Sequence, residues 1–161
     1  MLTGQPKGLS ESEVRELHLL AEPLKTACVE LADAGLPYTL EHGDFHGNNI
    51  NVTDHGHVIY DWTDGCVTHP FFCLTPLWEE ADPEIYARCV QAYLNEWAAY
   101  AAPDRLQAAL RLARPLGILH LAVSYRDIRL NTEPAARGEL EGALPFWLKQ
   151  LLMYKSQLLA G

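Results

Sequence analysis

Two acids and an amide stand close together in the sequence, around a short glycine-rich segment. Residues 42–49 read His-Gly-Asp-Phe-His-Gly-Asn-Asn, and Asp61 follows Asn49 by twelve residues. A carboxylate and a carboxamide offer the oxygen ligands that Mg²⁺ prefers, and Mg²⁺ often shares phosphate oxygens with a substrate. The second carboxylate, that of Asp44, could accept a proton from an attacking hydroxyl. These groups suit phosphoryl transfer, which needs a positioned nucleophile and neutralised charge more than covalent help from the protein.

Asp61 can approach Asn49 only if the chain reverses between them. Residues 54–56 read Asp-His-Gly, which is typical of a tight turn, and short apolar runs flank it at 50–53 and 57–61. We therefore predict a β-hairpin whose two ends lie side by side, with Asn49 before the first strand and Asp61 at the end of the second. Loops held by rigid elements often carry function, so we expect the site here.

The rest of the chain is predicted to be a helical scaffold. Residues 10–35 begin with a capping-box pattern and continue at helical spacing, with Pro23 starting a second helix. Residues 70–161 also repeat apolar residues at helical spacing, which is typical of core packing. The predicted fold is mainly α with a small β-hairpin (α+β), in a single domain: residues 1–161, comprising a flexible start (1–9), a helical section (10–35), the catalytic loop and hairpin (38–62) and a helical subdomain (70–161) whose last helix covers 144–159.

The acidic composition narrows the range of partners. Twelve Lys and Arg residues against 21 Asp and Glu residues give a formal net charge of −9, which disfavours nucleic acids and anionic membranes as partners. An acidic surface would tolerate a cationic small molecule as a ligand. No stretch approaches membrane-spanning length, and the four cysteines lack the paired spacing of a structural zinc site. We predict a cytoplasmic protein with reduced cysteines.

The motifs also carry a family resemblance. The run at 42–50, followed by Val-Ile-Tyr-Asp-Trp at 58–62, resembles the catalytic loop and metal-binding segment of the aminoglycoside phosphotransferase/choline kinase family. That family shares the general plan of protein kinases, whose H-R-D-x-x-x-x-N loop has a similar order of residues. The resemblance implies a kinase-type phosphotransferase with ATP as co-substrate, Mg²⁺ as cofactor and a small-molecule hydroxyl as acceptor, which could be cationic.

Residue by residue, the resemblance implies distinct roles around the loop. Asp44 would be the catalytic base, and Asn49 and Asp61 would hold Mg²⁺ and, through it, the nucleotide. His42 would brace the loop by hydrogen bonding, and His46 would lie near the phosphates or the acceptor. The site prediction therefore consists of these five residues.

Three further residues bear on the state of the loop. Gly43 and Gly47 fit the tight backbone that such a loop requires. Cys73 departs from the family pattern, because it stands where the family usually has an aspartate. If that aspartate braces the catalytic loop, its loss affects the order of the loop and hence activity.

The resemblance does not extend to a nucleotide-binding lobe. The family implies an N-terminal lobe with a glycine-rich loop and a strand lysine paired with a helix glutamate. The 41 residues before His42 contain no G-x-G-x-x-G, and their lysines, Lys7 and Lys25, lie outside any strand pattern. We therefore expect the C-terminal lobe of a protein-kinase-like fold without its N-terminal lobe. Such a lobe could be a fragment, could self-associate, or could pair with a separate N-terminal lobe.

Two alternatives remain open. The lobe could have lost catalysis and serve as a ligand-binding or protein-interaction module. In a different class of protein, His42, Asp44, His46 and His69 could ligate a transition metal in a hydrolase, since H-x-D-x-H is similar to such clusters.

Overall fold

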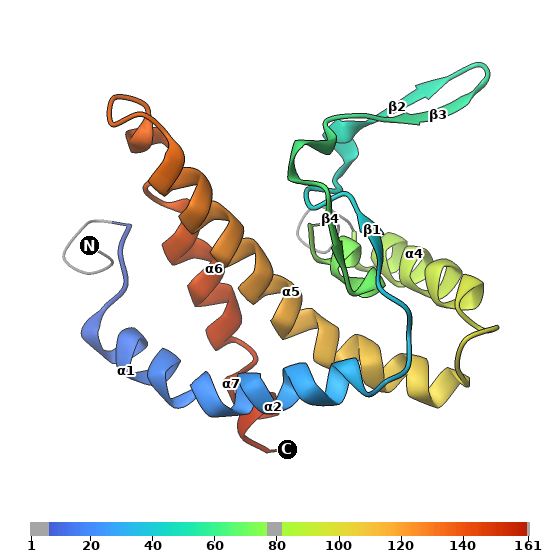
Figure 1. Ribbon diagram of the computed structural model, residues 1–161, viewed down its shortest axis with the longest axis horizontal. Helices are drawn as coiled ribbons and strands as arrows, with labels where there is room; N and C mark the ends of the chain where they lie inside the picture. The colour runs from blue at the N-terminus through green and yellow to red at the C-terminus, as the bar shows by residue number, and fades with distance from the viewer. Residues whose placement is uncertain (1–6, 77–81, 161) are drawn as a thin grey trace. The chain divides into compact units, whose positions relative to one another are not determined.

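The computed structural model describes residues 7–76 and 82–160, and these residues are mainly helical with two small antiparallel sheets (Figure 1). The predicted class, mainly α with a small β component, is confirmed; most of the predicted flexible start lies outside the described residues. The helices are α1 (Glu11–Leu19), α2 (Ala21–Ala32), α4 (Pro83–Glu96), α5 (Pro103–Asn131), α6 (Ala143–Leu152) and α7 (Lys155–Leu159). The 3₁₀ helices are η1 (Gly47–Asn49), η2 (Trp62–Asp64), η3 (Pro70–Cys73) and η4 (Arg137–Leu140), and the strands are β1 (Thr39–Glu41), β2 (Ile50–Thr53), β3 (Gly56–Ile59) and β4 (Cys66–Thr68).

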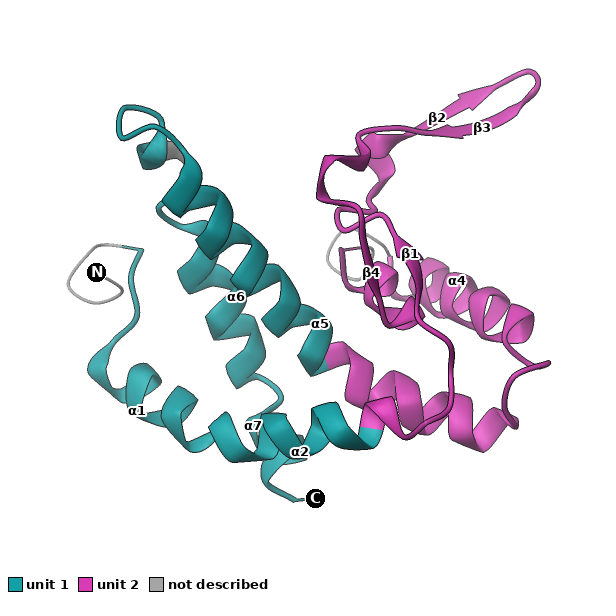
Figure 2. Cartoon of the chain, in the orientation of Figure 1, with its two compact units in different colours: residues 1–30, 115–161 teal, residues 31–114 magenta. Residues whose placement is uncertain are grey.

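The chain divides into two compact units, one of residues 1–30 with 115–161 and one of residues 31–114 (Figure 2). Every predicted site residue belongs to the second unit. The assignment of all 161 residues to a single domain stays a prediction. Within the described residues, no helix combines the length and the hydropathy that crossing a bilayer would require.

The first helix, α1, begins with a capping box at its N-terminus. Glu13 donates its backbone N–H to Ser10 Oγ at 3.2 Å, and Ser10 donates its own to Glu13 Oε2 at 2.6 Å, which completes the predicted capping box. The second helix, α2, begins at Ala21 and not at Pro23 as predicted. Pro23 lies in its first turn, where a missing N–H costs no helical hydrogen bond.

The C-terminal part of the first unit differs from the prediction in one respect. The helix predicted over 144–159 is two helices, α6 and α7, separated by a turn at residues 153–154. In this unit α1 contacts α6. Lys155, the first residue of α7, has its Nζ 3.0 Å from Oε2 of Glu16 in α1. The apolar pattern continues through the turn, which is why periodicity alone did not reveal the break.

The core of the second unit is built around Phe71, whose side chain is 1% exposed. Its ring makes edge-to-face contacts with Tyr93, which lies in α4, and with Trp97, the residue that caps the C-terminus of α4. The ring centroids are 6.0 Å apart in each case. The N-terminus of α4 is capped by Asp82 as predicted, with Pro83 at the first helical position. Buried residues of α4 and α5 complete the core: Tyr86, Val90, Leu94, Leu106, Leu110 and Ala113.

The predicted hairpin is confirmed, and a second strand pair accompanies it. β2 pairs with β3 so that Ile50 lies opposite Ile59 and Thr53 opposite Gly56. β1 pairs with β4, with Glu41 opposite Cys66. The sequence did not predict this second ladder because each of its strands has three residues and the pairing spans a long stretch of chain.

Truncation of Phe71 to alanine should lower the free energy of unfolding by about 3–5 kcal/mol, because it leaves a cavity in the core. Phe146→Ala is the matched control, since that ring is 43% exposed and its loss should cost less than about 1.5 kcal/mol. Urea denaturation followed by circular dichroism measures both values. Equal losses in the two variants would contradict the central position of Phe71.

Candidate active site

His42 joins the catalytic loop to the end of the hairpin. Its ring is buried, its Nδ1 accepts the backbone N–H of Asp44 at 3.3 Å, and its Nε2 lies 2.8 Å from the carbonyl oxygen of Tyr60. Because Nδ1 is an acceptor, the neutral ring carries its proton on Nε2, and this N–H donates a hydrogen bond to the carbonyl oxygen of Tyr60. One imidazole thus holds both the backbone of Asp44 and the residue before Asp61.

Asn49 makes a second link between the same two segments. Its side chain is buried, and its Nδ2 donates to the backbone carbonyl of Asp44 at 2.9 Å. Its own backbone carbonyl accepts the N–H of Tyr60 at 3.1 Å, which extends the hairpin by one hydrogen bond toward Asp61. Since the amide nitrogen is used inside the protein, the amide oxygen is the atom of Asn49 that could bind a ligand.

Asp44 and His46 are in direct contact. His46 Nδ1 accepts the backbone N–H of Asn48 at 3.2 Å, so the neutral ring carries its proton on Nε2, which lies 3.2 Å from Asp44 Oδ2. The Nδ2 atom of Asn49 is 3.4 Å from the same oxygen. Oδ2 is therefore held from two sides, while the side chain of Asp44 as a whole remains about one-third exposed (35%).

Asp61 stands exposed after the hairpin in an unusual backbone conformation. With φ 61° and ψ 59° it lies in the left-handed region, as no other non-glycine residue of the described chain does. Such conformations are uncommon outside glycine and concentrate at functional sites. Its Oδ1 accepts the hydroxyl of Thr63 at 2.7 Å, which limits the rotation of the carboxylate.

Gly43 allows the loop and the segment after Asp61 to approach each other. Its φ is 81°, and a Cβ at this position would collide with the backbone carbonyl of Asp64. Gly47 has open space around it and no left-handed backbone, so the expected requirement for glycine there is not seen. The glycine that the loop depends on is therefore Gly43.

The structure thus brings the predicted residues together to different degrees. Asp44, His46 and Asn49 touch one another, and His42 holds their loop to the hairpin. Asp61 is placed by the backbone of Tyr60 next to it, and within the described residues no hydrogen bond joins its carboxylate to Asn49. Their catalytic and metal-binding roles stay predictions.

The geometry does not favour a transition-metal cluster. Both ring nitrogens of His42 are bonded to backbone groups, and His69 Nδ1 accepts the N–H of Phe71 at 3.2 Å. Burial lowers the pKa of His69 to about 4 and keeps it neutral. In residues 7–76 and 82–160, no three His, Cys, Asp or Glu side chains are grouped as a metal site would need.

Glu41 is a buried acid that sequence reasoning missed. It is 7% exposed at the end of β1, and its Oε1 accepts the hydroxyl of Thr39 at 2.7 Å. Burial raises the pKa of the Glu41 carboxyl, and the hydrogen bond from Thr39 offsets part of this rise. An acid directly after a short strand-like run and directly before His42 was the signal available in the sequence.

Cys73 lies beside Glu41. Its thiol donates to the carbonyl of Pro70 at 3.1 Å, and burial, with the nearby Glu41 carboxyl, raises the pKa of this thiol to about 12. Tyr93 donates its hydroxyl to the same carbonyl at 2.9 Å. A buried carboxyl therefore does lie next to position 73, but it comes from β1.

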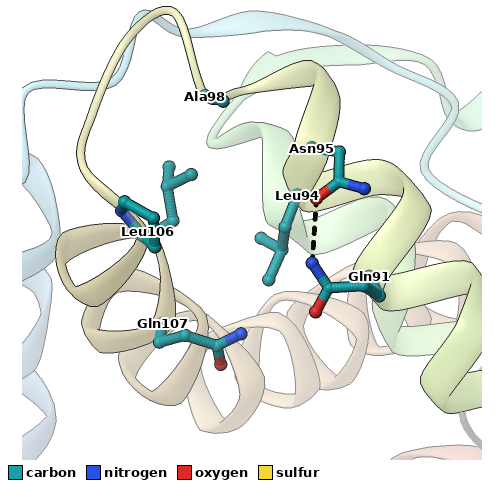
Figure 3. A pocket seen from close by; sticks show the side chains of 7 residues that line it. Gln91, Leu94, Asn95, Ala98, Leu106 and Gln107 are labelled. Carbon is teal, nitrogen blue, oxygen red and sulfur yellow. Dashed lines mark hydrogen bonds between the residues drawn. The ribbon is translucent and has the colours of Figure 1, made fainter.

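Described residues of the second unit line a large cavity and a small one. The larger, of about 690 Å³, is called the loop cavity here, and it is lined by Leu40, Glu41, His42, Phe45, Ile50, Ile59, Trp62, Cys73, Leu74, Cys89, Ala92, Tyr93 and Glu96. The smaller, of about 80 Å³, lies where α4 faces the start of α5, and there Gln91 donates to Asn95 at 2.8 Å (Figure 3). The loop cavity alone of these two adjoins the predicted site.

Comparison with protein families decides the broader class. The sequence model of the phosphotransferase enzyme family matches residues 4–109, about two-thirds of the chain. The chain belongs to this family. The match includes the catalytic loop and the hairpin, and it confirms the family resemblance drawn from the motifs. Comparisons of this phosphotransferase family member with curated proteins and with solved structures gave no match.

Replacing Glu41 by glutamine should make stability less dependent on pH. Because its pKa is raised in the folded state, its stabilising contribution is fully present below the unfolded value of about 4.5 and is lost as pH rises through the folded value. The wild type should therefore lose more stability than Glu41→Gln between about pH 5 and pH 8 in urea unfolding. Glu30→Gln, at an exposed acid, should keep the wild-type slope, and parallel profiles for all three proteins would contradict the prediction.

Introducing aspartate at position 73 should destabilise the protein by about 1–3 kcal/mol, because a second carboxyl would be buried beside Glu41. In the Glu41→Gln background the same change should cost about 1 kcal/mol less. Chemical denaturation of the four proteins of this double-mutant cycle gives the coupling. Strictly additive effects would show that the two side chains do not interact.

Proposed function

We propose that this member of the phosphotransferase enzyme family is the catalytic lobe of a protein-kinase-like fold and transfers the γ-phosphate of ATP to a small-molecule hydroxyl. The observation that carries the proposal is the double attachment of Asn49. Its side chain bonds to the carbonyl of Asp44 and its backbone bonds to Tyr60, so the candidate base and the segment of Asp61 are held to one residue. This is the linkage that a shared site for base and metal ligands requires.

The donor set suits a hard divalent cation. Asn49 and Asp61 offer a carboxamide and a carboxylate oxygen, which are Mg²⁺ ligands by chemistry. No Lys or Arg occurs in the sequence between Lys25 and Arg88, so this stretch provides no permanently cationic side chain to neutralise phosphate charge. Mg²⁺ held by these two residues would supply that neutralisation.

The protein's own groups are suited to receive the proton of the acceptor. His46 donates to Oδ2 of Asp44 and Asn49 contacts the same atom, which leaves Oδ1 as the oxygen that we assign to the acceptor hydroxyl. As the hydroxyl oxygen bonds to the γ-phosphorus and the bond from phosphorus to the β–γ bridging oxygen breaks, the hydroxyl proton passes to Oδ1 and ADP leaves. His42 and His46 act as positioning residues in this scheme.

A binding module without turnover is the second candidate function. The observation that favours it is Cys73, a neutral and half-buried thiol at the position where the resemblance implies an aspartate. In that case the loop would keep its shape and lose its activity. The cytoplasmic location, the exclusion of nucleic acid partners and pairing with a further lobe stay predictions under either function.

Titration of the protein with Mg-ATP tests the proposal. Isothermal calorimetry should show saturable binding, and Asp61→Ala should raise Kd by at least about tenfold, which corresponds to about 1.4 kcal/mol. Asp44→Asn should keep binding but lower turnover by about 10²–10⁴, because a general base is removed. Asp54→Ala is the matched control, since Asp54 is an exposed acid in the turn of the same hairpin.

The outcomes separate the two functions. No heat at millimolar Mg-ATP, with a native circular dichroism spectrum, would overturn the phosphotransferase proposal for this chain and favour the binding module. Equal weakening by Asp54→Ala and Asp61→Ala would indicate a general effect of acidic charge on the hairpin and would overturn the assignment of Asp61.

A further inference from the structure

We propose that the hydroxyl groups of Tyr60 and Thr63 position the two candidate metal ligands, Asn49 and Asp61, and that this positioning selects Mg²⁺ over the larger Ca²⁺. Both residues act through another side chain, so they are positioning residues and not catalytic ones. The selection of Mg²⁺ rests on the proposed function, whereas the positioning of the loop does not.

The side chain of Tyr60 caps the 3₁₀ helix η1, whose last residue is Asn49. The last carbonyls of a helix have no partner within it, and Tyr60 donates its hydroxyl to one of them, the carbonyl of Asn48. The other end of the same peptide group is also bonded, because the N–H of Asn49 donates to the carbonyl of His46 at 3.0 Å. The peptide plane that leads into Asn49 is therefore held from both sides.

The orientation of this peptide plane affects where the side chain of Asn49 points. Its Nδ2 donates to the carbonyl of Asp44 at 2.9 Å, so its oxygen is the atom left for a cation. The backbone of Tyr60 adds two further bonds, from its N–H to the carbonyl of Asn49 at 3.1 Å and from Nε2 of His42 to its own carbonyl at 2.8 Å. Since both of these belong to the backbone, Tyr60→Phe removes the hydroxyl bond and leaves them in place.

Thr63 has the corresponding role for Asp61. Its hydroxyl donates to Asp61 Oδ1 at 2.7 Å, and both residues are exposed, so burial does not hold the carboxylate. Thr63 lies in η2, which begins directly after Asp61 and brings the hydroxyl back to the carboxylate. With Oδ1 engaged in this bond, Oδ2 is the oxygen that we assign to the cation.

Ligands that are held in place favour Mg²⁺ over Ca²⁺. Mg²⁺ requires nearly octahedral geometry with oxygens at about 2.0–2.1 Å, whereas Ca²⁺ accepts flexible geometry at about 2.3–2.6 Å. Removal of a group that orients a metal ligand typically costs about 10–100-fold in metal affinity. In this exposed hairpin the two hydroxyls supply restraint that burial does not, so their loss should weaken binding of the ion that tolerates less freedom.

Hydrogen exchange of the metal-free protein tests the role of Tyr60 by itself. In Tyr60→Phe the amide of Asn49 should exchange about threefold to tenfold faster, because its peptide group loses the bond at the carbonyl end. NMR of the ¹⁵N-labelled protein measures this rate. Tyr38→Phe is the matched control, since Tyr38 is 62% exposed and lies outside the hairpin, and it should keep the wild-type rate. Equal rates in the wild type and Tyr60→Phe would overturn the capping role.

Calorimetry with Mg-ATP and with Ca-ATP tests the selection of the cation. Tyr60→Phe and Thr63→Val should each raise Kd for Mg-ATP about threefold to tenfold and change Kd for Ca-ATP less than about twofold. The ratio of the two constants is decisive, because a variant that is merely less stable would bind both complexes equally less well. A ratio that stays at the wild-type value in either variant would overturn the role of that residue in selection.

Thr63→Ser separates the hydroxyl of this residue from its shape. Serine keeps the hydroxyl and should bind Mg-ATP within about twofold of the wild type, whereas valine keeps the shape and lacks the hydroxyl. Thr26→Val makes the same change at an exposed threonine of α2 and should leave both constants unchanged. Equal weakening by Thr63→Ser and Thr63→Val would show that Thr63 acts through packing and would overturn its assignment.

Two results distinguish the positioning roles from the proposed function. If the wild-type protein does not bind Mg-ATP, the proposed function and the selection of Mg²⁺ are both overturned, while faster exchange in Tyr60→Phe would still establish the capping of η1. If the wild type binds Mg-ATP and neither variant changes the ratio of constants, the proposed function stands and the selection of Mg²⁺ by Tyr60 and Thr63 is overturned.

Discussion

The buried ring of His42 is the interaction on which the candidate site depends. The ring bonds to the N–H of Asp44 and to the carbonyl of Tyr60, two groups that are far apart in the chain, and it thereby holds the catalytic loop against the end of the hairpin. Each hydrogen bond is worth about 1 kcal/mol net, and loss of the ring would leave both backbone groups without these partners. Asn49 repeats the connection through its side chain and its backbone. Two independent links of this kind hold a loop to a hairpin that has little core of its own.

The hairpin itself is weakly supported. All of its residues from Asn51 to Tyr60 are exposed, and a two-stranded sheet is marginal in isolation. Its register is nevertheless defined, because pairing of Ile50 with Ile59 is continued by the bond from Tyr60 to Asn49. The position of Asp61 thus follows from hydrogen bonding at the base of the hairpin and from the close approach of Gly43 to Asp64, and not from burial of the strands.

Glu41 is a buried acid that lies next to position 73. The resemblance implies a carboxyl at position 73, where a thiol stands, and the structure has a carboxyl beside it on Glu41. Burial raises the pKa of the Glu41 carboxyl and of the neighbouring Cys73 thiol, and so disfavours a negative charge on either group. The same two side chains also line the loop cavity.

The sequence by itself determined what is local: the capping box at Ser10, the hairpin turn at 54–56, the cap at Asp82, and the motifs that identify the phosphotransferase family. These features depend on residues a few positions apart, whose propensities act without the rest of the chain. Tertiary structure alone decided the pairing of β1 with β4, the burial of Glu41 beside Cys73, and the cavity that gathers Leu40, Trp62 and Glu96. Each of these brings together residues distant in the chain, and such contacts are set by packing and desolvation, which leave no periodic trace in the order of the amino acids.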